Sequence, residues 1–108
     1  MHILKSEHND RHVWRLEGVL NASNVAQLKE EMENIIKSDI PIVVLDVEHL
    51  TEIDSSGIGA IVSLLKRMRM KKGDVRLLRL RGGVKRLFEL LRIDRSMEVF
   101  EDLEQALA

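Results

Sequence analysis

The sequence contains no cysteine and no tyrosine, and its only aromatic residues are Trp14, Phe88 and Phe100. Without cysteine the chain forms neither disulfides nor thiolate metal sites. A core with so few aromatic side chains must be aliphatic. No apolar run approaches the roughly 18 residues of a membrane span, and residues 1–10 lack the apolar stretch of a secretory signal. We therefore expect a cytoplasmic protein with no membrane association, metal or other cofactor.

The length of 108 residues corresponds to one domain, which we expect to span residues 1–108. The composition is 44% hydrophobic and 32% charged, which is typical of a globular rather than a disordered chain. No internal repeat or low-complexity linker divides it.

Positive charge is concentrated in one segment, although the net charge is only −1. Residues 66–95 contain 12 Lys and Arg against 3 Asp and Glu, whereas residues 1–65 contain 5 against 11 and residues 96–108 contain none against 4. Such a block suits nucleic acid or another anionic ligand, which stays open as an alternative. However, Phe88 is its only aromatic residue and has core spacing, so stacking on bases is not supported. We expect a solvated basic face that steers an acidic protein partner, with no direct DNA binding.

Alternating strand and helix patterns run along the whole chain. Strands are predicted at 2–8, 12–18, 42–47 and 75–80, with a short extended piece at 97–100 and Gly18 ending the second strand. Helices are predicted at 25–36, 56–70, 84–91 and 101–107, with Gly73 terminating the long one and Val84, Leu87, Phe88 and Leu91 on one face of the helix 84–91. This order predicts the α/β class, with a single mixed β-sheet packed by helices.

A strand-to-helix turn at residues 53–59 contains two adjacent serines. Asp54, Ser55 or Ser56 is a natural cap for the helix that follows. Two glycines in the same turn predict that the hydroxyls are accessible to another protein. Asp46, Glu48, Glu52 and Asp54 precede the serines, and acids at a helix start favour its positive dipole end more often than they bind a metal.

Nucleophilic catalysis by either serine has little support in the sequence. A catalytic serine needs a base, usually histidine, and three of the four histidines lie near the N-terminus. The turn also lacks the Gly-x-Ser-x-Gly pattern of hydrolases. His8 and His12 flank a turn and predict no metal site. We therefore expect a protein that is not an enzyme.

The motif Asp54–Gly59, preceded by the apolar strand 42–47 and followed by Gly83–Leu90, resembles the STAS domain of bacterial anti-sigma-factor antagonists. The resemblance extends over nearly the whole chain and implies a STAS-like fold. In that family the first serine after the aspartate is phosphorylated, which implies Ser55 as the phosphoacceptor and Ser56 as the second choice.

The resemblance also implies partners and a switch. The unphosphorylated form would bind an anti-sigma factor serine kinase and so release the sigma factor, and a metal-dependent serine phosphatase would reset the modified form. The implied partner-binding residues are Asn21, Asp54, Ser55, Ser56, Gly57, Ile58 and Gly59. Asn21 stands where the family commonly has Asp. An asparagine carries no charge, so it cannot supply the carboxylate that this Asp would bring to kinase recognition or phosphate handling. A STAS module that regulates a non-sigma target or a transporter, with a ligand pocket between helices, is the alternative.

Overall fold

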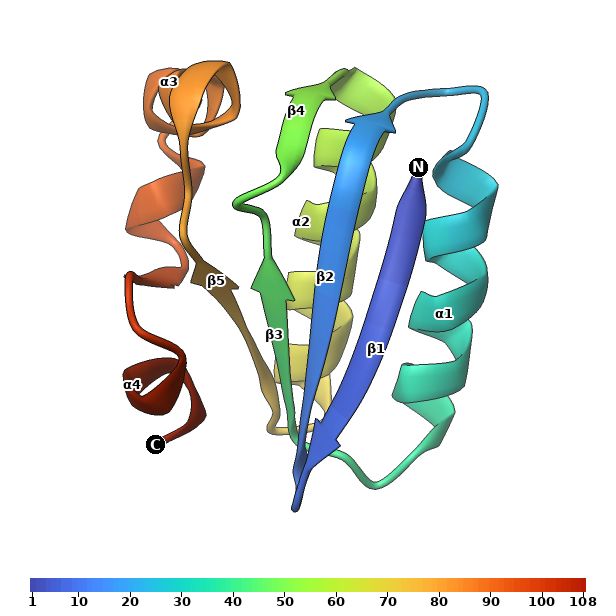
Figure 1. Ribbon diagram of the computed structural model, residues 1–108. Coiled ribbons are helices and arrows are strands. Elements are labelled where there is room, and N and C mark those ends of the chain that lie inside the picture. The colour runs from blue at the N-terminus through green and yellow to red at the C-terminus, as the bar shows by residue number, and fades with distance from the viewer.

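A mixed β-sheet forms the centre of the computed structural model, which describes all residues from 1 to 108 (Figure 1). The strands are β1 (His2–His8), β2 (Arg11–Leu20), β3 (Ile42–Asp46), β4 (Leu50–Ile53), β5 (Asp74–Leu78) and β6 (Glu98–Phe100). The helices are α1 (Val25–Lys37), α2 (Ser55–Met70), α3 (Gly82–Leu90) and α4 (Leu103–Leu107), with a 3₁₀ turn at Ile93–Arg95. The predicted α/β class and mixed sheet are confirmed. None of the helices combines the length and the apolarity needed to cross a membrane.

The sheet has the order β1-β2-β3-β5-β6, and β4 pairs with β2 outside this path. β1 and β2 form an antiparallel hairpin, which a two-residue turn can close. All other pairs are parallel. Parallel neighbours need longer crossovers, and the segments that contain α1, α2 and α3 provide them here.

The long strand β2 pairs with two strands in succession. Residues 11–15 pair with β3 and residues 18–20 pair with β4, and within this second pairing the register shifts between Gly18 and Val19. Gly18 has a φ of +98°, a conformation that side chains disfavour. The prediction that Gly18 ends this strand is therefore wrong: its backbone redirects the strand, which continues to Leu20.

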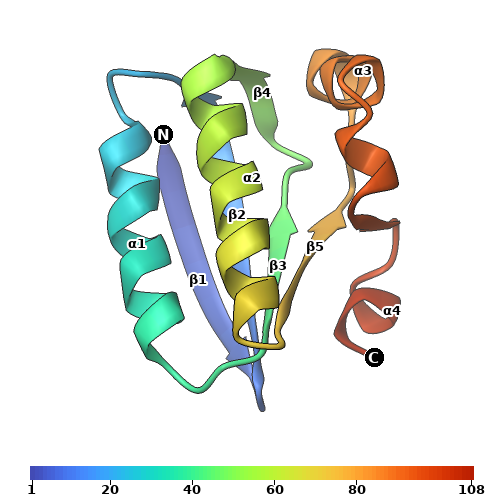
Figure 2. The ribbon, with the colours of Figure 1, turned by 180° about the vertical axis from the view of Figure 1, so that it is seen from behind.

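Helices α1 and α2 cover one face of the sheet (Figure 2). Between them and the sheet lies a cluster of 24 buried residues that includes Trp14 and Leu16. Val13 points to the opposite face and joins a smaller cluster with Val44, Leu78 and Ala106 under α4. This division of Trp14 and Leu16 from Val13 follows from the alternation of side chains along a strand.

Two local features differ from the prediction. β4 was not expected, because its four residues have apolar side chains only at Leu50 and Ile53 and show no alternation. At the end of α2, Lys72 rather than Gly73 takes the left-handed conformation, with a φ of 64°. The Gly73 N–H donates to the Met68 carbonyl at 2.8 Å, and an added Cβ at Gly73 would collide with the Pro41 carbonyl. Glycine is required there by close packing.

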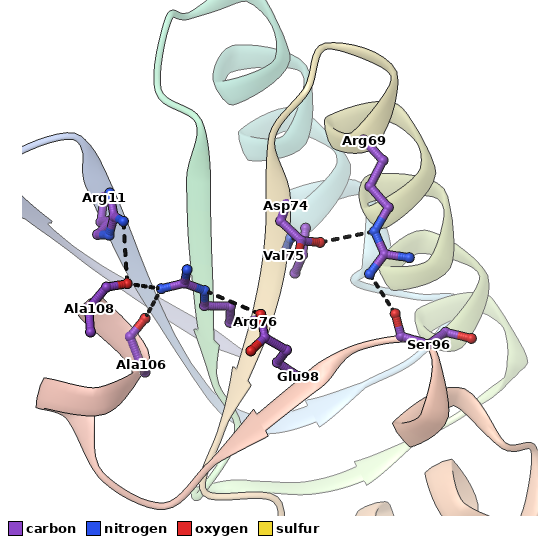
Figure 3. A network of polar contacts seen from close by, with 9 residues as sticks. All are labelled: Arg11, Arg69, Asp74, Val75, Arg76, Ser96, Glu98, Ala106 and Ala108. Atoms are coloured by element: carbon purple, nitrogen blue, oxygen red, sulfur yellow. Dashed lines mark hydrogen bonds and ion pairs between the residues drawn. The ribbon is translucent and has the colours of Figure 1, made fainter.

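Half of the cations in the basic segment bind other parts of the chain. Arg76 donates to the carbonyls of Ala106 (2.7 Å) and Ala108 (2.8 Å) and thereby holds α4 against the sheet (Figure 3). The cations with partners are Arg67, Arg69, Lys71, Arg76, Arg79 and Arg81. Those without an ion pair or side-chain hydrogen bond are Lys66, Lys72, Lys85, Arg86, Arg92 and Arg95. Six of the twelve cations are therefore bound within the chain, and a solvated basic face that steers an acidic partner stays a prediction.

Candidate functional site

Two parallel strands end side by side at the candidate site. Leu20 of β2 pairs with Ile53 of β4, and the Asp54 N–H donates to the Leu20 carbonyl at 3.1 Å. The carboxyl ends of parallel strands meet at one edge of a sheet, so the loop 21–24 lies beside the start of α2 (Figure 1). The pairing of β2 with β4 is what brings these two segments together.

Asp54 connects the two segments through its carboxylate. Its Oδ1 caps α2 by accepting hydrogen bonds from the backbone N–H groups of Ser56 (2.9 Å) and Gly57 (3.1 Å). Its Oδ2 accepts a hydrogen bond from the Ala22 N–H (3.1 Å). Of the three predicted caps, Asp54 is the one observed. Both oxygens are engaged, so Asp54 holds the turn in shape.

The other acids of the predicted cluster separate in the structure. Asp46 is buried and pairs with Arg79 at 3.4 Å, and Glu48 pairs with His49 at 3.4 Å. Glu52 is exposed on β4. Only Asp54 lies at the start of α2, so the prediction that these acids favour the helix dipole holds for Asp54 alone.

Asn21 directs its side chain into its own loop. Its Oδ1 accepts from the backbone N–H (3.0 Å) and the hydroxyl (2.6 Å) of Ser23. Asn24 accepts from the Asn21 N–H at 2.9 Å and donates to the Val19 carbonyl at 2.7 Å. Asn24 occupies the N-cap position of α1, but its side chain makes no cap bond to the first turn of that helix. These bonds fix the loop.

Ser55 is the first residue of α2 and is exposed, whereas Ser56 is half-buried. None of the side-chain hydrogen bonds within the chain involves the Ser55 hydroxyl. The N–H groups of Ser56 and Gly57 already bind Asp54, so they are not available to a group attached at Ser55. The Ser55 hydroxyl is therefore exposed and is not held by the first turn of α2.

The two glycines of the turn have different roles. Gly57 is buried, and an added Cβ would lie 2.7 Å from both Ile53 Cγ1 and Leu20 Cγ. Gly59 is exposed, with open space at the Cβ position. Gly57 thus allows α2 to pack against the ends of β2 and β4. The sequence predicts that both glycines leave the serine hydroxyls accessible, but only Gly59 lies at the surface beside them. Ile58 is 9% exposed and belongs to the core.

A groove of about 280 Å³ runs between α1 and α2 and includes Ser55. It is lined by Lys29, Met32, Glu33, Ser55, Ser56, Gly59, Ala60, Ser63 and Arg67. Arg67 and Glu33 form a two-point ion pair across it, with one bond of 3.1 Å. The hydrogen bond from Arg67 holds the pKa of Glu33 below its usual value, and Glu33 in turn raises the pKa of Arg67. This pair ties α1 to α2 along the groove.

No histidine contacts Ser55. His8 bonds to Ser6 at 3.0 Å, His12 lies 3.6 Å from Glu7, and His49 pairs with Glu48. No group of three or more His, Asp or Glu side chains is placed to hold a metal ion. The base that a serine nucleophile requires is not in position.

The fold and the turn define the class of protein. The sequence matches the family model described as STAS domain over residues 3–106, and the chain belongs to this family. The recognition made from the Asp54–Gly59 motif is confirmed.

Three relatives illustrate the likeness. BtrV of Bordetella bronchiseptica, named as a candidate anti-sigma factor antagonist, is 32% identical over 75 residues, which are 69% of this chain and 65% of BtrV. A candidate anti-sigma factor antagonist from Thermotoga maritima has a TM-score of 0.90 at 21% identity, covering 97% of this chain and 91% of that one. Phosphorylated SpoIIAA of Bacillus has a TM-score of 0.79 at 20% identity, covering 98% and 96%. The two structures establish likeness of fold.

Proposed function

We infer that this protein is an anti-sigma-factor antagonist in a partner-switching pathway, not an enzyme, and that Ser55 is its phosphoacceptor. The observation that carries this inference is the exposed Ser55 hydroxyl, which has no partner in the chain and sits on a turn fixed by Asp54. The unmodified form binds an anti-sigma factor serine kinase and thereby frees the sigma factor. Family membership and the name of BtrV support this role.

The chemistry of the modification belongs to the kinase. The Ser55 Oγ attacks the γ-phosphorus of ATP, its proton passes to a base of the kinase, and ADP leaves. A metal-dependent serine phosphatase reverses the change by hydrolysis, which returns the Ser55 hydroxyl and inorganic phosphate. The protein contributes a presented hydroxyl and a docking surface. A protein that is phosphorylated by an ATP-dependent kinase works where ATP is present, so this role implies a location in the cytoplasm.

The switch is electrostatic. Phosphorylation adds about −1.5 to −2 charges next to Asp54, the cap of α2. Asp54 already binds the N–H groups of the first turn, so the phosphate stays at the surface and meets the partner directly. A partner surface fitted to a neutral serine is then repelled, while the positive end of α2 keeps the fold tolerant of the charge.

Two other functions make different predictions. A nucleic-acid binder would have an affinity for oligonucleotides that falls steeply as the salt concentration rises. Substitution or phosphorylation of Ser55 would not change that affinity. Six of the twelve cations in the basic segment are already paired within the chain, which disfavours this role. A STAS module acting on a non-sigma target or a transporter would bind a different partner, and Ser55 would matter only if that partner reads its charge.

The test is incubation with the candidate kinase encoded nearby and ATP, followed by intact mass and site mapping. One added phosphate on Ser55, absent from Ser55→Ala and retained in Ser56→Ala, is the expected result. A phosphate that Ser55→Ala still gains at the same rate assigns the site to Ser56 or elsewhere. No phosphate on the wild-type protein contradicts the proposed function.

A further inference from the structure

Leu91 is exposed although its spacing predicts a core residue. Val84 and Phe88 of the same pattern are buried, but Leu91 is 52% exposed. Helix α3 ends at Leu90, and Arg92 then takes the left-handed conformation, with a φ of 59° and a ψ of 24°. This turn leads the chain into the 3₁₀ turn and leaves the Leu91 side chain at the surface, so Leu91 does not continue the helix face of Val84 and Phe88 as its spacing predicts.

Leu91 forms one wall of a second groove, which we call the α2–α3 groove and which has a volume of about 240 Å³. It is lined by Val62, Leu65, Lys66, Arg69, Leu91, Arg92, Ile93 and Ser96. Leu65 and Ile93 are buried and Val62 is half-buried, so these side chains supply an apolar floor. The groove is therefore bounded by helix α2 on one side and by the end of α3 and the 3₁₀ turn on the other.

Only positive charge lines this groove. Arg69 is fixed by hydrogen bonds to Asp74 (3.0 Å) and to the Ser96 carbonyl (2.6 Å), which join α2 to the segment before β6 (Figure 3). Lys66 and Arg92 have no ion pair or side-chain hydrogen bond in the chain. An occupant with carboxylates would neutralise two charges that the protein itself leaves free.

The backbone conformation of Arg92 provides a matched control for the test of this groove. Glycine or asparagine is usual in the left-handed position after a helix, because other side chains are strained there. A cation near a helix C-terminus is favourable, which is one reason for Arg92. Lys72 after α2 is in the same situation, with a φ of 64°, but does not line the groove. Substituting Arg92 and Lys72 by glycine therefore separates the effect of backbone strain on stability from the effect of the groove on binding.

We propose that the α2–α3 groove docks an acidic amphipathic helix of a partner protein. Its apolar face lies on Val62, Leu65, Leu91 and Ile93, and its carboxylates face Lys66 and Arg92. An apolar groove with charged rims is the form in which proteins receive an amphipathic helix. Lys66 lies about three turns along α2 from Ser55, and the groove shares no residue with the one that contains Ser55. The proposal is therefore independent of phosphorylation at Ser55.

The test uses a synthetic peptide of about 14 residues, or four helical turns, with leucines on one face and glutamates on the other. The protein carries labelled Ile, Leu and Val methyl groups, and the peptide should shift those of Val62, Leu65, Leu91 and Ile93. Leu4 on β1 is also 52% exposed and serves as the control for non-specific contact. A peptide with lysine for each glutamate should bind at least about tenfold more weakly. Equal shifts at Leu4, or equal binding of the lysine peptide, would overturn the proposal.

Two glycine variants complete the test. Arg92→Gly should bind the peptide at least about fivefold more weakly than wild type, because it loses a cation of the rim. Its melting temperature should rise, because glycine suits the backbone, so a loss of binding cannot be ascribed to unfolding. Lys72→Gly should gain stability in the same way and keep the wild-type affinity. Wild-type affinity in Arg92→Gly, or an equal loss in Lys72→Gly, contradicts the assignment.

Discussion

The Asp54 carboxylate accepts a hydrogen bond from the Ala22 N–H at 3.1 Å, while its other oxygen caps α2. One side chain thus joins the loop before α1 to the turn that carries Ser55. The consequence is that the position of the proposed phosphoacceptor depends on a contact between segments 32 residues apart. The proposed switch requires such a fixed turn, because a partner can only read a charge that is held in a constant place.

Asp54→Ala should lower the free energy of unfolding by about 1–3 kcal/mol, because it removes a helix cap and the bond to Ala22. Asp54→Asn should lose less, because its amide oxygen still accepts from the first turn of α2. Urea unfolding of both variants checks this. Glu52→Ala is the control, since Glu52 is exposed on β4. A loss in Glu52→Ala as large as that in Asp54→Ala would contradict the role given to Asp54.

Gly57→Ala should destabilise the protein by about 1–3 kcal/mol, because the added methyl group overlaps Ile53 and Leu20 in a packed region. Gly59→Ala should instead stabilise α2 by about 0.5–1 kcal/mol, since its Cβ meets open space and alanine favours helix. Thermal unfolding of the two variants gives opposite signs if the packing is as described. Equal effects would mean that the close approach at Gly57 is not real.

Arg76→Ala should release α4, because Arg76 donates to the carbonyls of Ala106 and Ala108 and lies over the Phe100 ring, 5.9 Å from its centroid. Hydrogen exchange of the α4 amides should become faster, with exchange in α2 little changed. Arg86→Ala removes a cation of α3 that has no partner and should leave α4 protected. Unchanged protection in Arg76→Ala would show that the apolar contacts of α4 suffice.

Glu33 gives a dependence on pH with a defined sign. Its folded pKa is lowered chiefly by the hydrogen bond from Arg67, so the stabilisation is present above the usual Glu pKa of about 4.3 and is lost as pH falls through the lower folded value. Glu33→Gln should therefore melt below wild type at neutral pH and match it in strong acid. Glu30→Gln, an exposed neighbour on α1, is the control. A difference in melting temperature between Glu33→Gln and wild type that grows as pH falls would contradict this sign.

Local patterns were sufficient to predict much of the fold. The apolar run 42–47 and the helical spacing of residues 58–68 identify β3 and α2, and the polar residues between them identify the turn with Ser55. Asp54 was among the predicted caps because capping depends only on neighbours in sequence. These elements need no information from distant residues.

Features that depend on distant partners could not be predicted. β4 is too short for a pattern and exists because the end of β2 extends beyond β3 and pairs with it. The need for glycine at 57 arises from Leu20, and the role of Arg76 arises from α4. The groove at Leu91 depends on where α3 ends and on the left-handed Arg92, which the apolar spacing of that segment does not reveal.

The most direct test of the switch compares Ser55→Asp with Ser55→Ala by titration calorimetry against the kinase, with melting curves on the same samples. Ser55→Asp should bind at least about tenfold more weakly, equivalent to roughly 1.4 kcal/mol, with little change in melting temperature because the start of α2 tolerates an anion. Ser55→Ala should bind as the wild type does. Wild-type affinity in Ser55→Asp, together with normal binding of the phosphorylated protein, would show that charge at Ser55 is not read by the kinase.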